Sequence, residues 1–423
     1  MRLAYLLILT PALAAAQPAP SPDPASGSGS AVLEPAAPPP PPAPATSTSS
    51  LATPAVAPPA SPQTSTDVSQ SRTPEPGEPW SLRPGFFVQE QYRAKENSVV
   101  QNDQDGFRLA RARVTATGAG KIGSFELSSY FEAEMQPQFS LYDAYVTISK
   151  PLPKDGVLTL DLGQMRVPIS RQQLISDTRR AWVDGGQTQS IAPDRDLGMK
   201  LWYVPSQLHM LRVIGGVFNG EGRDQIQNIN ERYFWAGRVE VTPFGDVQPY
   251  AESAFAGNWL SFAFNAGHNV LTPGVYEEKQ ISWGYDVSGC WRGLSGSFEY
   301  LQVNHYYEGN SSMFPGKDYH ANGFVAQLNY MLPIKLYRDT RLEVGARVEE
   351  IDRDDTDPIE MAGDPNQSQR IYSGVISYYL RQHQMKIQVV GYHYQQIENK
   401  TATGMDATYP EDQILAQVTY RVE

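Results

Sequence analysis

The sequence predicts an all-β protein: a sixteen-stranded antiparallel transmembrane β-barrel with an inward-folded third outer loop, preceded by a disordered Pro-rich segment. Three observations carry this prediction. From Leu82 to the C-terminus, apolar and polar residues alternate in short runs bounded by turn residues. The connections between these runs are mostly short at one end and long at the other. One long connection, residues 165–195, holds five arginines and is too long for an ordinary hairpin turn.

The N-terminal residues are not predicted to be part of the barrel. Residues 1–16 have a basic start (Arg2), an apolar stretch too short to span a bilayer as a helix, and small residues at the end, which is typical of a secretory signal peptide. Residues 17–79 hold 18 of the 34 prolines and no aromatic residue. Such a segment cannot bury enough apolar surface to fold, so we expect a disordered periplasmic tether. The barrel domain is therefore predicted at 80–423.

Composition excludes several classes of function. Residues 1–79 carry two of the 34 basic and five of the 46 acidic residues, which leaves the barrel with 32 basic against 41 acidic groups. This balance argues against a nucleic-acid partner. Cys290 is the only cysteine, so neither an intramolecular disulfide nor a thiol metal site is expected. The six histidines are scattered and none adjoins a nucleophile motif, so we predict no enzyme, cofactor or metal.

The alternation places sixteen strands at 83–95, 105–118, 121–134, 139–150, 156–164, 196–205, 208–219, 231–243, 258–269, 279–291, 295–307, 319–332, 339–351, 369–381, 384–397 and 411–423. Short turns are expected at 118–120, 153–156, 205–207, 292–293 and 382–383. Most connections at the opposite end are long and polar, whereas 244–257 and 332–338 fit poorly as tight turns. Short periplasmic turns and long outer loops are typical of outer-membrane barrels, so we predict that the chain contacts outer-membrane lipid.

Residue faces support a membrane barrel around water. In the second strand Ala112 and Val114 lie on one face, whereas Arg111 and Arg113 lie on the other. An Arg or Lys on the lipid face near mid-bilayer costs about 2–4 kcal/mol, so the charged faces should line the lumen. Aromatic residues near strand ends are expected at the membrane interfaces; they include Trp80, Tyr142, Trp202 and Tyr379. Sixteen strands enclose an aqueous channel and not a packed core.

Three segments resemble a known family. They are LYDAYVTI (141–148), LDLGQMRVPISRQQLISDTRRAWVD (160–184) and DRDLGMKLW (194–202). Together they are similar to the phosphate-selective porin O and P family, which has a DAYV segment, a strand ending in L-x-GQ, and an R-D-x-G strand start. The resemblance implies a homotrimeric porin with a basic constriction formed by the third outer loop, passing phosphate or other small anions.

Ten cationic residues are candidates for an anion pathway. Such a pathway needs several weak, successive sites, and the fork of an arginine matches phosphate oxygens. Five candidates lie on predicted lumen faces and five belong to the 165–195 segment: Arg111, Arg113, Arg238, Arg347 and Lys386; Arg166, Arg171, Arg179, Arg180 and Arg195. We expect Leu174, Ile175 and Trp182 to anchor the loop.

The alternative for these cations is an internal lattice of ion pairs with acidic residues that the alternation also turns inward: Asp143, Asp161, Glu240, Asp286, Glu299, Glu343 and Glu349. For the strand cations we favour the lattice, and for the loop arginines we favour the constriction. The acidic segment 349–364 is interpreted as a solvated outer loop in preference to a divalent-cation site. A non-selective or sugar-type porin, and a closed structural or adhesin-like barrel, are the alternative functions.

Overall fold

The computed structural model describes residues 80–95, 105–154, 156–208, 210–225, 227–245, 250, 252–253, 255, 257–271, 277–308, 318–334, 337, 340–354, 368–396 and 412–422. The predicted signal peptide (1–16), the tether (17–79) and residues 355–364 of the acidic loop lie outside the described residues.

Sixteen strands form the barrel: β1 (Trp80–Lys95), β2 (Gly106–Ile122), β3 (Phe125–Glu134), β4 (Ser140–Pro151), β5 (Val157–Arg166), β6 (Arg195–Val204), β7 (Leu211–Phe218), β8 (Phe234–Phe244), β9 (Trp259–Leu271), β10 (Glu277–Trp291), β11 (Leu294–Glu308), β12 (Tyr319–Met331), β13 (Arg341–Asp352), β14 (Gln369–Arg381), β15 (Met385–Gln396) and β16 (Gln413–Val422). Each predicted strand is present. The predicted fold is confirmed.

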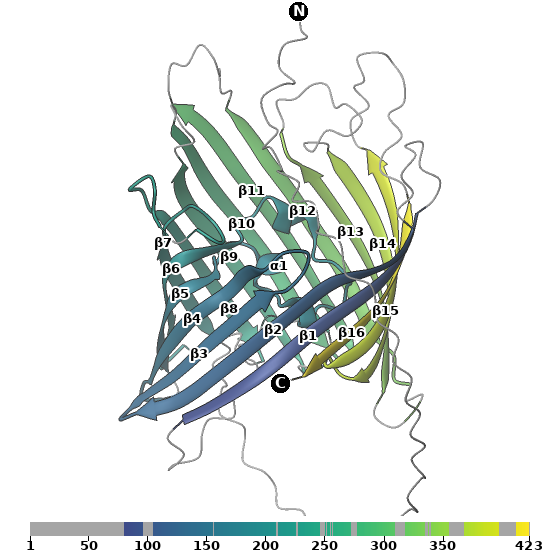
Figure 1. The fold of residues 1–423 in the computed structure, drawn as a ribbon, viewed down its shortest axis with the longest axis horizontal. Coiled ribbons are helices and arrows are strands. Elements are labelled where there is room, and N and C mark those ends of the chain that lie inside the picture. Colours follow the sequence, from purple (N-terminus) through teal and green to yellow (C-terminus); the bar gives the residue numbers. More distant parts are fainter. Residues whose placement is uncertain are drawn as a thin grey trace, which may run out of the picture. The chain divides into compact units, whose positions relative to one another are not determined.

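The strands close into one antiparallel barrel. Each pairs with its neighbours in sequence, and β1 lies beside β16 (Figure 1). Gln91 of β1 is opposite Gln417 of β16. Because the barrel is closed, none of these strands has an unpaired edge. Unpaired backbone N–H and C=O groups at such an edge would be costly in the hydrocarbon region of a bilayer. No helix among the described residues is long and apolar enough to cross a membrane.

The two faces of the wall differ as the alternation predicts. Val114 and Phe264 are 40% and 53% exposed on the outer face, whereas Arg113 and Asn265 are 3% and 1% exposed on the inner face. The seven acidic residues predicted to point inward are all buried. An apolar outer belt therefore surrounds a polar interior.

The short turns follow the prediction with one exception. At Arg292-Gly293 both residues have positive φ, 48° and 89°, as a tight two-residue hairpin turn requires. The turn predicted at 118–120 is wrong, because β2 pairs with β3 as far as Ile122 and Phe125. Gly120 lies against the ring of Trp80, and a Cβ there would clash with that ring. This glycine therefore accommodates a neighbouring aromatic ring and does not turn the chain.

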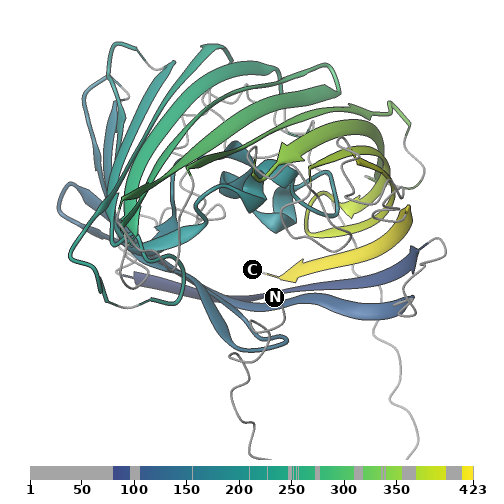
Figure 2. The same ribbon diagram turned by 90° about the horizontal axis from the view of Figure 1, so that it is seen from above.

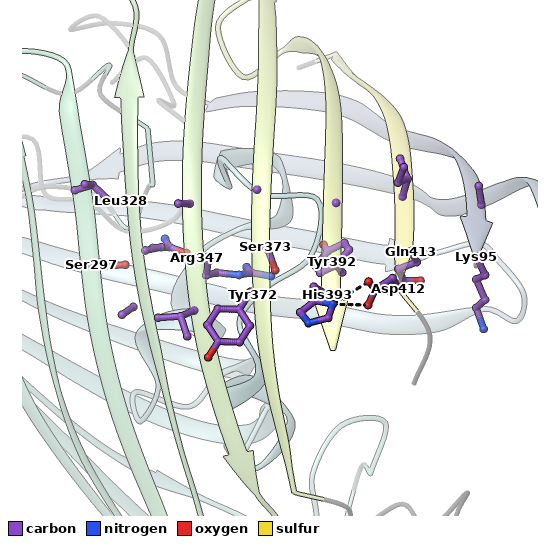
Figure 3. A pocket seen from close by; sticks show the side chains of 18 residues that line it. Lys95, Ser297, Leu328, Arg347, Tyr372, Ser373, Tyr392, His393, Asp412 and Gln413 are labelled. Atoms are coloured by element: carbon purple, nitrogen blue, oxygen red, sulfur yellow. Dashed lines mark hydrogen bonds and ion pairs between the residues drawn. The ribbon is translucent and has the colours of Figure 1, made fainter. Parts of the chain in front are cut away.

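The outer face of β12–β16 and β1 is hollowed. A groove of about 1200 Å³ runs across these strands, between the exposed side chains Leu328, Tyr372 and Ile414 (Figure 3). The His393 ring contacts Asp412 in this groove, with Nδ1 and Oδ2 2.8 Å apart. The lining residues belong mainly to the lipid-facing side, so this hollow is not the passage through the barrel.

Candidate functional site

The segment between β5 and β6 folds into the barrel and forms three short helical turns: α1 (Arg171–Leu174), η1 (Asp177–Arg179) and η2 (Gln187–Ser190). Seen along the barrel, α1 and its neighbouring turns lie inside the ring of strands (Figure 2). We call residues 167–194 the constriction loop. The sequence prediction of an inward-folded third outer loop is confirmed.

Glu299 of β11 holds both halves of the constriction loop. Its Oε1 accepts hydrogen bonds from Ser170 Oγ (2.7 Å) and Thr188 Oγ1 (2.6 Å), and its Oε2 accepts from the Gln172 amide (3.0 Å). Ser170 also caps α1, because its Oγ accepts from the Gln173 amide. One buried carboxylate thus satisfies amide and hydroxyl donors that a short loop helix would otherwise leave unpaired.

The tip of the loop is docked on β14 and β15. The Ala181 carbonyl accepts hydrogen bonds from Ser377 Oγ (3.0 Å) and Gln388 Nε2 (2.6 Å), and Lys386 Nζ donates to the Arg180 carbonyl. The Trp182 side chain is fully buried and belongs to an apolar cluster with Ile371, Val375, Val390, Tyr392 and Leu415. Trp182 is therefore the wall anchor that the sequence predicts. Leu174 and Ile175 are also buried, but they pack around Tyr250.

Eight of the ten predicted pathway cations are buried: Arg113, Arg166, Arg171, Arg180, Arg195, Arg238, Arg347 and Lys386. Four of them make close ion pairs on the barrel wall or at its loop end. Arg113 contacts Glu132 and Glu134, each at 2.8 Å. Arg238 contacts Asp286 at 2.6 Å, Arg347 contacts Glu349 at 2.9 Å, and Arg195 contacts Asp143 at 3.1 Å.

The loop cations are also engaged. Arg166 Nη1 donates to the Leu174 carbonyl (2.9 Å), and the Arg171 guanidinium lies 5.6 Å from the ring centre of Tyr250. Arg180 Nη1 lies 2.9 Å from Asp177 Oδ1. The ion pairs of Arg238, Arg347 and Arg195 belong to the lattice that the sequence left open as an alternative, whereas these loop cations are held by contacts within and around the loop. Arg111 and Arg179 are the two predicted cations that stay partly accessible.

Asp177 joins three of the predicted cations. Its carboxylate lies 3.2 Å from Arg111 Nε, 2.8 Å from Arg113 Nη2 and 2.9 Å from Arg180 Nη1. Burial acts to raise the pKa of the Asp177 carboxyl, but the surrounding guanidinium groups hold that pKa well below its ordinary value. The constriction loop is therefore tied to the inner face of β2 by an ionised carboxylate.

Arg93 and Arg108 are two inward arginines at the loop end of β1 and β2 that the sequence analysis missed. Arg108 is exposed, and its Nε donates to Gln91 Oε1 (2.8 Å). Arg93 is half-buried and, among the described residues, has no carboxylate partner within ion-pair distance. Arg108 interacts electrostatically with Arg93, Arg111 and Asp184. The inner face of β1 and β2 thus carries three accessible guanidinium groups.

Alternation on β1 is enough to find Arg93, since Gln89, Gln91 and Arg93 share a face. Arg108 is different. The register shifts where Gln89 pairs with Arg111 and Glu90 pairs with Leu109, so that Ala110 is bulged out of the ladder. The bulge turns Arg108 inward, whereas strict alternation from Arg111 would turn it outward.

Several aromatic residues also face inward, against the prediction of interfacial girdles. The guanidinium groups of Arg113, Arg195 and Arg223 lie 4.1, 4.5 and 4.5 Å from the ring centre of Tyr142. Trp202 donates from Nε1 to Asp161 Oδ2 (2.6 Å), and Tyr379 donates to Glu343 Oε2 (2.6 Å). Stacking on guanidinium groups and hydrogen bonds to carboxylates make these rings part of the charged interior.

Comparison with solved structures identifies the architecture. The barrel is similar to the anion-selective porin from Comamonas acidovorans (TM-score 0.53, 12% identity, 81% of this chain and 99% of that one). It is also similar to the outer-membrane protein OmpT of Vibrio cholerae in its trimer form (TM-score 0.55, 9% identity, 82% and 100%). OprB of Pseudomonas putida gives a TM-score of 0.53 at 9% identity, over 81% of this chain and 94% of that one. The fold is that of an outer-membrane porin.

The porin fold and the apolar outer belt agree with the predicted location in a Gram-negative outer membrane. The predicted channel, in preference to an enzyme, stays a prediction that agrees with this fold. No protein-family profile and no curated protein sequence matches the chain. The resemblance to phosphate-selective porins therefore stays a prediction. Among the described residues, no group of three or more His, Cys, Asp or Glu is placed to hold a metal ion.

Proposed function

We propose that the chain is a porin through which small anions, phosphate among them, diffuse passively along the inner face of β1 and β2. The observation that carries this proposal is the set of accessible arginines Arg93, Arg108 and Arg111. Arg108 is held by the amide oxygen of Gln91, whereas Arg111 donates to the amide oxygen of Gln89 (2.6 Å) and also pairs with Asp177 (3.2 Å). Asp184, with a side chain 39% exposed, is the accessible carboxylate near them.

An amide partner orients a guanidinium group without neutralising it. Arg108 can therefore attract an anion, whereas Arg113, between Glu132, Glu134 and Asp177, has its charge compensated. A pair of unit charges about 4 Å apart is worth about 1 kcal/mol in bulk water and about 4 kcal/mol at an effective dielectric of 20. Several such sites along neighbouring strands favour entry without trapping the anion.

The ten cations of the predicted pathway then divide into two roles. Arg111 and Arg179 lie within reach of a solute. The other eight hold the constriction loop and the wall in place, and so fix where the accessible arginines stand. One structurally similar protein is an anion-selective porin from Comamonas acidovorans, which agrees with this proposal at the level of the fold.

The first test is the reversal potential in asymmetric KCl across a planar bilayer, repeated with added phosphate. We expect wild type to prefer anions and R108Q to shift towards cations, with weaker block of chloride current by phosphate. K121Q is the matched control, because it removes one cation from the same strand near the β2–β3 turn, where Lys121 pairs with Glu126 at 3.2 Å. Cation preference in wild type, or equal shifts in both variants, would refute the proposal.

The proposal includes a homotrimer, since a structurally similar protein is described in a trimer form. Mass measurement of the purified protein in detergent tests this association, and a stable monomer would refute it.

A sugar-type porin is the second candidate, because one observation favours it. Tyr394 on the inner face of β15 is partly accessible and its ring stacks on that of the buried Tyr392 with centres 6.2 Å apart, and an aromatic face can pack against a sugar ring. Liposome swelling with neutral sugars separates the two candidates. Fast swelling together with no ion preference would favour the sugar porin.

A further inference from the structure

The connection between β8 and β9 enters the barrel from the end opposite to the constriction loop. Its length fits no tight turn, and its described residues include Tyr250, Glu252, Ser253 and Phe255. Tyr250, Glu252 and Ser253 are only 4–6% exposed. The constriction loop follows the odd-numbered strand β5, whereas this connection follows the even-numbered strand β8. In an antiparallel barrel these two segments start at opposite ends and meet inside.

Glu252 contacts both the loop tip and the barrel wall. Its Oε2 accepts a hydrogen bond from the Ala181 amide (3.0 Å), and its backbone amide donates to the Arg179 carbonyl (3.2 Å). On the wall, its Oε1 accepts from Gln327 Nε2 (2.9 Å), and its carbonyl accepts from Ser295 Oγ (2.9 Å). One residue thus joins β11 and β12 to residues 179–181 of the loop.

Tyr250 supports the first half of the loop in a similar way. Its ring packs against Leu174 and Ile175. The guanidinium groups of Arg171 and Arg212 lie 5.6 and 5.0 Å from its ring centre. Its hydroxyl donates to Glu240 Oε2 (3.0 Å), so the ring is fixed to the wall at β8.

The end of the segment is fixed at the turn between β14 and β15. Ser253 Oγ and His383 Nε2 are 2.5 Å apart. The Phe255 ring meets the Tyr379 and His383 rings edge-on, at 5.0 and 5.3 Å between centres. The described residues of this connection are therefore held at the wall while Glu252 reaches the loop.

We propose that Glu252 and Tyr250 are positioning residues for the constriction: from the periplasmic side they set where the tip of the outer loop stands, and thereby the selectivity of the passage. The proposal rests on the proposed porin function. The Ala181 amide is fully buried, so loss of the Glu252 carboxylate would leave it unpaired. Arg179, Arg180 and Asp177 stand within a few residues of this point, and Asp177 contacts Arg111. Movement of the tip would therefore move the charges beside the passage.

The test is single-channel recording of E252A and E252Q. Loss of the carboxylate in E252A removes charge-assisted hydrogen bonds, and we expect current excursions to become about tenfold more frequent and the reversal potential to shift. In E252Q the amide oxygen can still accept from Ala181, so the frequency of excursions should stay near that of wild type. Removal of a negative charge beside Arg180 should make E252Q more anion-selective.

E126A is the matched control, because the Glu126 side chain is 39% exposed and pairs with Lys121 near the turn after β2. Folding of every variant is checked by the mobility shift of the unheated barrel on a gel. If E252A shows the same frequency of current excursions and the same reversal potential as E126A, the inference is overturned and the porin proposal is left intact.

If E252A does not fold, E252D takes its place, because its carboxylate is one methylene shorter. A wild-type frequency of current excursions in E252D would equally overturn the inference. Wild type without ion conduction would instead refute the porin proposal.

Discussion

At the scale of the residue, most charge inside the barrel holds the structure together. Arg238 is 1% exposed and binds Asp286 through both Nη atoms, at 2.6 and 3.0 Å, with Glu240 at 3.5 Å. Removing one member of such a cluster leaves the other charges buried and uncompensated, which costs more than the pair gained. Buried arginines of this kind cannot be replaced without loss of stability.

We therefore expect R238M to lower the free energy of unfolding by about 3–5 kcal/mol. The measurement is urea unfolding of the barrel in lipid vesicles. R370M is the control, because Arg370 pairs with Glu350 (2.6 Å) where its side chain is 37% exposed, and no measurable change is expected there. Equal losses in the two variants would contradict the distinction between buried and exposed pairs.

At the scale of the element, the constriction loop depends on its tip. Trp182 is fully buried, and the Arg347 guanidinium lies 4.6 Å from its ring centre. Replacing a buried Trp by Ala costs about 3–5 kcal/mol where the site cannot collapse. We expect W182A to release the loop, seen as faster cleavage by protease within 167–194. W182F should protect the loop nearly as well as wild type, and equal cleavage of all three proteins would contradict the anchor role.

The connection between β8 and β9 contacts His383 through Ser253 and Phe255, and we expect this histidine to make the stability of the fold depend on pH. Burial lowers the pKa of His383 well below its ordinary value of 6.5, and Lys386, Arg179 and Arg421 lower it further. Because the folded state binds the proton more weakly than the unfolded state, this group makes the fold less stable as the pH falls below about 6.5.

We therefore expect the unfolding midpoint of wild type to fall between about pH 7.5 and about pH 5 by more than that of H383N, which has no proton to bind in this range. Tyr379 and Ser253 also contact His383, but neither titrates in this interval. Parallel changes in wild type and H383N would show that other groups cause the acid response.

The sequence predicts all sixteen strands because alternation is local, whereas the site depends on contacts between distant segments. Arg111 and Arg113 are predicted to face the lumen and do so, but nothing in the pattern shows that Asp177 reaches them from the loop. Because Ala110 forms a bulge, strict alternation assigns Arg108 to the wrong face of the strand. The unusual length of the connection after β8 is visible in the sequence, but its entry into the barrel depends on tertiary contacts of Tyr250 and Glu252.

At the scale of the whole barrel, the interior is divided into a filled side and an accessible side. The constriction loop and Tyr250 cover inner residues of β8 and β9 such as Ser261, which is 3% exposed and donates to Glu240 Oε1 (3.1 Å). At the loop end of β1 and β2, Arg93, Arg108 and Arg111 stay accessible, whereas Gln89, Gln91 and Arg113 on the same inner faces are buried. The passage should therefore run beside Arg93, Arg108 and Arg111 at the loop end of β1 and β2, and this is the central claim about how the barrel works.

The most direct test is modification of single cysteines by an anionic thiol reagent during current recording, in a C290S background that removes the one native cysteine. The account predicts that the reagent reaches R108C through the passage and reduces the current. It should leave S261C unmodified behind the loop, and also L109C, which faces lipid with its side chain 46% exposed. A current that is unaffected in R108C but reduced in S261C would place the passage on the other side of the barrel and contradict the account.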